Sequence, residues 1–260
     1  MKSSPYFQSR NMALAALERY RVLTVEKGWP ISESKLGLYL PASVAFDMTA
    51  SEAVRRENHL EVFRHLRRYW GIGRKGNLWT QNRVFDVLTT NCQPCSLHHG
   101  LTLMTLGNAE SQDRVVHCLR ELRELKTLKS GRYPVMAVSK NLHFFNPRLF
   151  VIYDNQVVGG QVYPAFKQDW CSFYASLCLR DYGGIDDYVA YLLWAGHMIR
   201  NAYSGFMDDF AEWFINVVRE EDGTEAEDMR CELKTYYATF FEFVTIGAAL
   251  LEGNSACLCA

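Results

Sequence analysis

Two ionisable residues stand at the ends of a short central segment of this chain, Lys140 and Asp154. A lysine that loses its proton is a nucleophile that can form a Schiff base with a carbonyl carbon. A nearby carboxylate stabilises positive charge that develops on a reacting group. Each residue also has a plainer interpretation, as a surface lysine and as a helix cap. Together they are candidates for a catalytic pair.

The segment between these residues is patterned to hold both of them in place. Apolar residues recur at helical spacing over 135–145, which predicts a helix with Lys140 at the edge of its buried stripe. Pro147 ends this helix, because proline disfavours helical geometry in the residue before it. The apolar run 149–153 is predicted to enter the core, and Asp154 to cap a new helix.

Three motifs lie within residues 135–157. They are Ser-Lys-Asn-Leu-His-Phe at 139–144, an Asn-Pro turn at 146–147 and Phe-Val-Ile-Tyr-Asp at 150–154. In combination they resemble the bacterial 8-oxoguanine DNA glycosylase-fold proteins, relatives of the helix-hairpin-helix DNA glycosylase superfamily. The resemblance implies a DNA glycosylase that flips out and excises a damaged or modified base, with or without abasic-site lyase activity through a lysine Schiff base. Lys140 matches the family's lysine and Asp154 its aspartate.

Further residues are expected to bind DNA or the extruded base around this pair. Ser139 and His143 share the predicted helix with Lys140, and Tyr153 and Asn155 flank Asp154. Basic residues of two turn-forming segments are expected to bind the phosphate backbone: Lys129 and Arg132 before the central helix, and Arg74, Lys75 and Arg83 in and after a glycine-rich loop. An ordinary flexible turn between helices is the alternative for that loop. The expected partner is DNA with a damaged or modified base, and no cofactor is expected.

The chain departs from the family pattern at two places. The segment 129–134 stands where the superfamily has a Gly-Val-Gly hairpin, and the spacing from Lys140 to Asp154 is shorter than in its best-known members. The missing hairpin and a net charge of −1 motivate an alternative function, a non-catalytic binding module for modified DNA. A third hypothesis is a helical protein-interaction domain without a DNA role.

A second cluster of reactive side chains follows at Cys92, Cys95 and His99. With a remote ligand such as Cys118 these residues could form a tetrahedral zinc site. The alternative is an ordinary turn at Pro94, and we expect no metal. The cysteines after Asp154 lack the compact spacing of an iron–sulfur ligand loop, so no cluster is expected either.

The rest of the sequence predicts an all-α fold. The chain has 260 residues, 48% of them hydrophobic, which is ample for a large core. Helices are predicted over 11–27, 51–70, 78–90, 111–126, 163–179, 185–203, 208–219 and 230–251, with 31–50 irregular. The resemblance implies a single glycosylase-like domain, 1–260, with the site in the cleft between two helical subdomains. One would comprise about residues 1–110 plus the C-terminal helices, and the other 111–220.

The compartment is inferred from what the sequence lacks. No apolar run is long enough to cross a bilayer, and the first residues are polar, unlike a secretory signal. The scattered cysteines do not form the pattern of a disulfide framework. We therefore expect a soluble cytoplasmic protein without a membrane partner.

Overall fold

The computed structural model describes residues 4–47, 49–69, 85–86, 88–89, 100–121, 135–177 and 186–253. These residues form helices joined by turns, and none of them lies in a strand. The all-α prediction is therefore confirmed. No described helix combines the length and the apolar composition needed to cross a bilayer.

The helices follow one another along the chain in three groups. The first contains α1 (Pro5–Gln8), α2 (Arg10–Glu26), the π-helix η1 (Ser32–Leu36), α3 (Gly37–Ala45) and α4 (Glu52–Tyr69). The second contains the 3₁₀-helix η3 (Thr105–Gly107), α7 (Ala109–Glu121), α8 (Val135–Phe145), α9 (Asn155–Val157), the π-helix η5 (Val158–Val162), α10 (Tyr163–Ala165) and α11 (Lys167–Ser176). The third contains α12 (Asp186–Arg200), α13 (Phe206–Asp222), the 3₁₀-helix η6 (Glu227–Met229), α14 (Arg230–Leu233) and α15 (Tyr237–Leu251).

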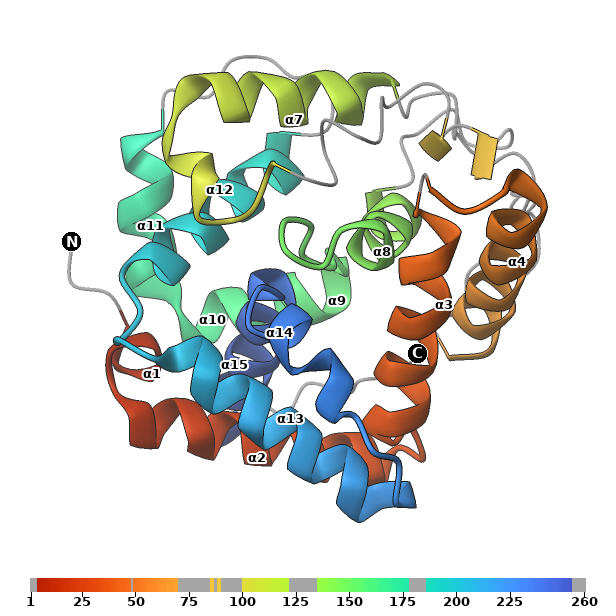
Figure 1. Ribbon diagram of the computed structural model, residues 1–260. Helices are drawn as coiled ribbons and strands as arrows, with labels where there is room; N and C mark the ends of the chain where they lie inside the picture. The colour runs from red at the N-terminus through yellow and green to blue at the C-terminus, as the bar shows by residue number, and fades with distance from the viewer. Residues whose placement is uncertain are drawn as a thin grey trace.

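Helix α8 occupies a central position in this arrangement. Figure 1 shows α8 and α9, in green, between α3 and α4 on one side and α10 to α12 on the other. Every side chain of α8 from Ala137 to Phe145 is buried. The apolar spacing predicts burial of Val135, Val138, Leu142 and Phe145. The last three are buried and Val135 is only partly buried, and no face of the helix is exposed to solvent over 137–145. Lys140 is therefore enclosed on a buried helix, and its predicted position at the edge of a stripe is wrong.

Helices α2 and α15 pack closely against each other. Gly247 makes this approach possible, because a Cβ at this position would collide with the Ala16 carbonyl. Nearby, the rings of Tyr20 and Phe243 stack with their centroids 4.1 Å apart. The contact fixes α15, which carries a residue of the site described below.

The prediction of irregular structure over 31–50 is wrong, because much of this range forms η1 and α3. Pro41 lies inside α3, where it removes one helical hydrogen bond. Burial of Leu38, Tyr39 and Ala42 outweighs that loss. The buried side chains of α3 therefore stabilise a helix although Pro41 favours a turn.

The last predicted helix, 230–251, is divided into α14 and α15. The amide of Ala238, near the start of α15, donates to the Pro147 carbonyl at 3.0 Å. This bond connects α15 to the turn that follows α8. The break at 234–236 thus brings the last helix against the central segment.

Candidate functional site

Lys140 and Asp154 meet in the structure. Their Nζ and Oδ2 atoms are 3.5 Å apart, and the side chains are 9% and 23% exposed. Lys140 lies near the middle of α8, whereas Asp154 immediately precedes α9. The ammonium is thus enclosed, while the carboxylate keeps access to the surface.

Asp154 uses its two oxygens differently. Oδ1 accepts a hydrogen bond from the Gln156 amide at 3.0 Å, which caps α9 and confirms the predicted capping role. Oδ2 faces Lys140. The cap fixes the carboxylate, so its contact with the lysine does not depend on a freely rotating side chain.

Ser139 joins the two ends of the segment. Its Oγ accepts a hydrogen bond from the Tyr153 amide at 2.9 Å, one residue before Asp154. The same hydroxyl donates to the Met136 carbonyl at 2.9 Å. Because Ser139 is adjacent to Lys140 on α8, this bridge fixes the separation between the helix and the aspartate.

The run between the two candidate residues is anchored in the core, as predicted. Leu149, Phe150 and Val151 have no exposed surface. The Val151 carbonyl accepts a hydrogen bond from the Tyr188 hydroxyl on α12 at 3.0 Å. The Phe150 carbonyl bonds to Nδ1 of His143 at 2.8 Å. Both backbone contacts are buried, which makes this part of the site rigid.

His143 belongs to a buried hydrogen-bonded chain. A carbonyl can only accept, so Nδ1 carries the proton that is donated to Phe150. Nε2 then accepts from the Tyr39 hydroxyl at 3.0 Å, and that hydroxyl bonds to Thr239 Oγ1 at 2.6 Å. Burial, together with the nearby Lys35 cation, lowers the pKa of His143 well below its usual value. His143 is therefore a neutral, fully buried support residue in this structure.

The structure adds a second charged pair that the sequence analysis missed. Lys35 Nζ, from η1, lies 2.9 Å from Oε1 of Glu242, from α15, and the side chains are 0% and 5% exposed. Oε2 of Glu242 lies 3.7 Å from Nε2 of His143. The available signal was Glu242 itself, the one charged residue within the apolar stretch 237–251, because an isolated charge in such a stretch is rarely buried without a partner.

Burial governs the protonation of these groups. Desolvation lowers the pKa of Lys140, and the carboxylates of Asp154 and Glu242 oppose that shift without cancelling it. Desolvation likewise lowers the pKa of Lys35 and raises that of Glu242. Lys140 therefore releases its proton more readily than a lysine in water, as a nucleophilic lysine must.

The remaining predicted site residues near the pair differ in accessibility. Asn155 is exposed beside Asp154, where it could contact a ligand. Tyr153 is buried, with 7% of its surface exposed, and its ring packs against Tyr188 and Tyr191. Ser139 has no exposed surface, so like His143 it acts on the site from within the protein.

Several predicted residues lie outside the part of the chain that the structure describes. These are the basic residues Lys129, Arg132, Arg74, Lys75 and Arg83, and the candidate zinc ligands Cys92, Cys95 and His99. Cys118 is buried on α7. Within the described ranges, no group of three or more His, Cys, Asp or Glu side chains is placed to hold a metal ion.

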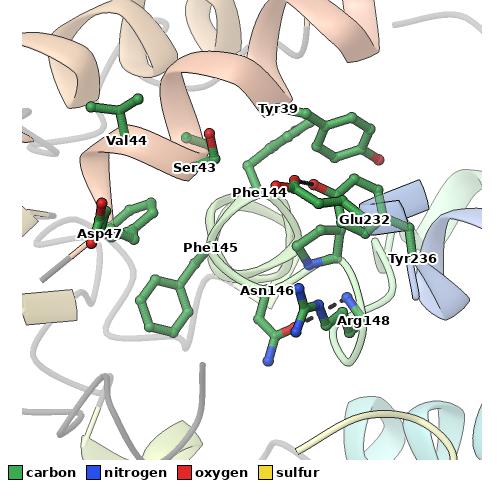
Figure 2. Close-up of a pocket in the computed structure, with 13 residues that line it drawn as sticks. Tyr39, Ser43, Val44, Asp47, Phe144, Phe145, Asn146, Arg148, Glu232 and Tyr236 are labelled. Carbon is green, nitrogen blue, oxygen red and sulfur yellow. Dashed lines mark hydrogen bonds between the residues drawn. The ribbon is translucent and has the colours of Figure 1, made fainter. Parts of the chain in front are cut away.

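A cavity of about 300 Å³ lies at the C-terminal end of α8. Figure 2 shows Phe144, Phe145 and Asn146 projecting from that end, with Ser43, Val44 and Asp47 on one side and Arg148, Glu232 and Tyr236 on the other. Neither Lys140 nor Asp154 lines it. The cavity is thus separate from the charged pair, although Phe144 stands one helical turn beyond Lys140.

Comparisons of the chain with protein-family models, curated proteins and solved structures found no match. The chemistry of the site therefore has to be inferred from its residues. The relevant features are the contact between Lys140 and Asp154, the burial that lowers the pKa of the lysine, and the rigid segment that joins them.

Proposed function

We propose that this protein is a DNA glycosylase that flips out and excises a damaged or modified base, with Lys140 and Asp154 as its catalytic pair. The observation that carries the proposal is the 3.5 Å contact between their charged groups. The resemblance of residues 135–157 supplies the reaction class, and it also suggests a helix-hairpin-helix glycosylase-like arrangement. The contact supports the geometry that this reaction requires.

Asp154 is proposed to stabilise the transition state. A base within a duplex is stacked and paired, so the enzyme must extrude the nucleotide before reacting with it. When the bond from C1′ to the base nitrogen breaks, its electron pair leaves with the base and positive charge develops on the sugar. A fixed carboxylate next to that charge lowers the barrier. The partial exposure of Asp154 gives an extruded sugar a route to it.

Lys140 is proposed to be the nucleophile. Its neutral amine attacks C1′, the new N–C1′ bond replaces the glycosidic bond, and the departing base takes up a proton. Loss of the amine proton and opening of the sugar ring then give a Schiff base, the intermediate for strand scission at the abasic site. The lowered pKa of Lys140 favours this role.

Substitution of the two residues tests the proposal. Asp154→Asn removes the charge but keeps the cap of α9, because asparagine caps a helix as well as aspartate does. We expect it to reduce single-turnover base release by a factor of about 100 or more, the usual cost of losing one electrostatic stabiliser. The matched control is Asp228→Asn, which changes an exposed carboxylate on η6.

Lys140→Met is expected to abolish the adduct that borohydride traps with DNA, whereas the exposed Lys167→Met should retain it. Full base release by Asp154→Asn would overturn the catalytic assignment. Tight binding of modified DNA without any release would instead favour the non-catalytic binding module.

A further inference from the structure

The cavity at the C-terminal end of α8 has no part in the proposed reaction, because neither Lys140 nor Asp154 lines it. We propose that this cavity binds a small zwitterion, namely an α-amino acid with an aromatic or other apolar side chain. Arg148 binds the carboxylate of the ligand, Glu232 binds its ammonium, and the aromatic residues of the cavity pack against its side chain. Binding of this kind does not require DNA.

The size and the lining of the cavity suit a small molecule with an apolar part. Its volume of about 300 Å³ lies at the lower end of the range of about 300–1,000 Å³ that is usual for ligand sites. Aromatic side chains make up much of the lining, and all of them are buried: Tyr39, Phe46, Phe144, Phe145 and Tyr236. The cavity is therefore an apolar recess in the fold, and the ligand that fits it is small.

Contacts between the rings hold this apolar lining in place. The rings of Phe46 and Phe145 meet edge to face, with their centroids 4.7 Å apart. The ring of Tyr39 contacts those of Phe144 and Tyr236, with centroid distances of 5.4 and 4.9 Å. An aromatic side chain of a ligand can extend such a set of rings in the same geometry. The lining therefore favours an apolar group, and an aromatic one most of all.

The tyrosine hydroxyls of the lining already have partners within the protein. The Tyr39 hydroxyl bonds to His143 and Thr239. The Tyr236 hydroxyl donates to Oε2 of Glu232 at 3.0 Å, which orients that carboxylate. The other oxygen of Glu232, Oε1, accepts no hydrogen bond from the described residues. Glu232 therefore offers a fixed carboxylate with one oxygen available to an ammonium group.

Arg148 supplies a positive charge to the same lining. Its backbone is held on both sides, because its amide donates to Oδ1 of Asn146 at 3.1 Å and its carbonyl accepts from the Leu103 amide at 2.9 Å. Its guanidinium makes no hydrogen bond or ion pair with the part of the chain that the structure describes. A guanidinium can bind a carboxylate through two parallel hydrogen bonds. Arg148 is therefore suited to bind the carboxylate of a ligand.

The two opposite charges line one cavity but form no ion pair with each other in the described structure. Figure 2 shows Arg148 and Glu232 on the same side of the end of α8. The other acid of the lining, Asp47, accepts from the amide and the hydroxyl of Thr49 at 2.9 and 2.7 Å, so it is engaged within its own turn. A simple anion or cation would satisfy one of the two separate charges, whereas a zwitterion satisfies both.

Binding of L-phenylalanine to the wild-type protein, measured by isothermal titration calorimetry, tests this site. Two analogues isolate the charges, because hydrocinnamate lacks the ammonium and phenethylamine lacks the carboxylate. L-phenylalanine should bind at least about tenfold more tightly than either analogue, since each analogue loses one charge-assisted contact. This comparison also covers the case in which a variant does not fold.

Two variants should weaken binding in a pattern that matches the analogues. Arg148→Met should weaken binding of L-phenylalanine and hydrocinnamate about tenfold and leave phenethylamine unchanged. Glu232→Gln should weaken L-phenylalanine and phenethylamine about tenfold and leave hydrocinnamate unchanged, while its amide oxygen still accepts from Tyr236. The matched controls are Arg219→Met and Glu225→Gln, which change an exposed ion pair that does not line the cavity.

Absence of saturable binding of both L-phenylalanine and L-leucine at millimolar concentration would overturn the proposal. Binding that neither variant weakens would also overturn it, because the ligand would then lie elsewhere. Equal affinity for hydrocinnamate and L-phenylalanine would show a site for anions only and would contradict the role of Glu232. These measurements use neither DNA nor the proposed catalytic pair, so they separate failure of this site from failure of the proposed glycosylase activity.

Discussion

At the scale of single residues, the buried charges determine both stability and chemistry. Lys35 and Glu242 are almost fully buried, so removing one partner leaves the other uncompensated. We expect Glu242→Leu to lower the free energy of unfolding by about 3–5 kcal/mol, measured by urea denaturation. Lys35→Met/Glu242→Leu should lose much less, because both charges are then absent.

An exposed ion pair provides the control for that comparison. Lys234 lies 2.7 Å from Asp208, with side chains 42% and 67% exposed. Lys234→Met should lower the free energy of unfolding by less than about 1 kcal/mol. A similar cost for Lys234→Met and Glu242→Leu would contradict the view that burial makes the inner pair important.

His59 is expected to make the stability of the protein depend on pH. Burial between Phe46 and Phe85, together with the Arg56 cation, lowers its pKa from 6.5 to about 4. Protonation of His59 therefore favours the unfolded chain. The contribution of the neutral residue to the free energy of unfolding is complete above pH 6.5 and is lost as pH falls toward 4. The loss amounts to about 3 kcal/mol.

The measurement for His59 is urea denaturation of His59→Leu at several pH values. The variant should lose less stability than the wild type between pH 7 and pH 4.5. His117→Leu, which changes an exposed histidine on α7, should follow the wild type. Identical pH dependence of wild type and His59→Leu would show that His59 does not titrate as proposed.

Contacts between residues that are close in the sequence could be predicted, whereas contacts between distant residues could not. Lys140 and Asp154 were identifiable because a short motif joins them and a proline turn limits their separation. Lys35 and Glu242 meet only through the packing of η1 against α15, and no local pattern encodes that contact. The hydrogen-bonded chain of His143 could not be predicted either, since it depends on Tyr39 and Thr239 from distant helices.

At the scale of helices, the contact between α2 and α15 depends on one glycine. Gly247→Ala would force the two backbones apart, because its Cβ would meet the Ala16 carbonyl. We expect a loss of about 1–3 kcal/mol in the free energy of unfolding, typical of overpacking in a core. Gly159→Ala, where the added Cβ meets nothing within 4 Å, should be neutral or slightly stabilising. Equal effects of the two substitutions would contradict this view of the helix contact.

The bridge from α8 to the aspartate gives a second prediction at this scale. Ser139→Ala would leave the buried amide of Tyr153 without its acceptor, at a cost of about 1–3 kcal/mol. Amide hydrogen exchange should report faster exchange at Tyr153, and base release should weaken because Asp154 is less well held. Ser43→Ala, which removes an exposed hydroxyl bonded to the Leu40 carbonyl, is the matched control. Unchanged exchange at Tyr153 in Ser139→Ala would refute the bridging role.

Helices were predictable where the helical spacing of apolar residues agreed with the residues that end a helix, such as proline. The bounds of α8 follow from its apolar spacing and from Pro147, and the structure reproduces them. The helix in the range 31–50 was missed because Gly37 and Pro41 suggested a break, whereas α3 contains both and buries one of its faces. Its stability comes from contacts with α4 and α8, which a local reading of the sequence cannot supply.

At the scale of the whole molecule, composition predicted a large core, and the helical spacing of apolar residues predicted an all-α fold. A continuous set of buried apolar side chains runs from α1 and α2 through α8 and α12 to α15. This core encloses Lys140 and leaves Asp154 nearer the surface. The division into two subdomains and the glycosylase-like arrangement stay predictions.

The proposed activity depends on a buried lysine and its neighbouring aspartate. The most direct measurement is a screen for base release across duplexes that carry different damaged or modified bases, read by mass spectrometry. We predict that the wild-type protein and Asp228→Asn release at least one free base, and that Asp154→Asn does not. Absence of release from every duplex, or equal release by Asp154→Asn, would contradict the proposed function.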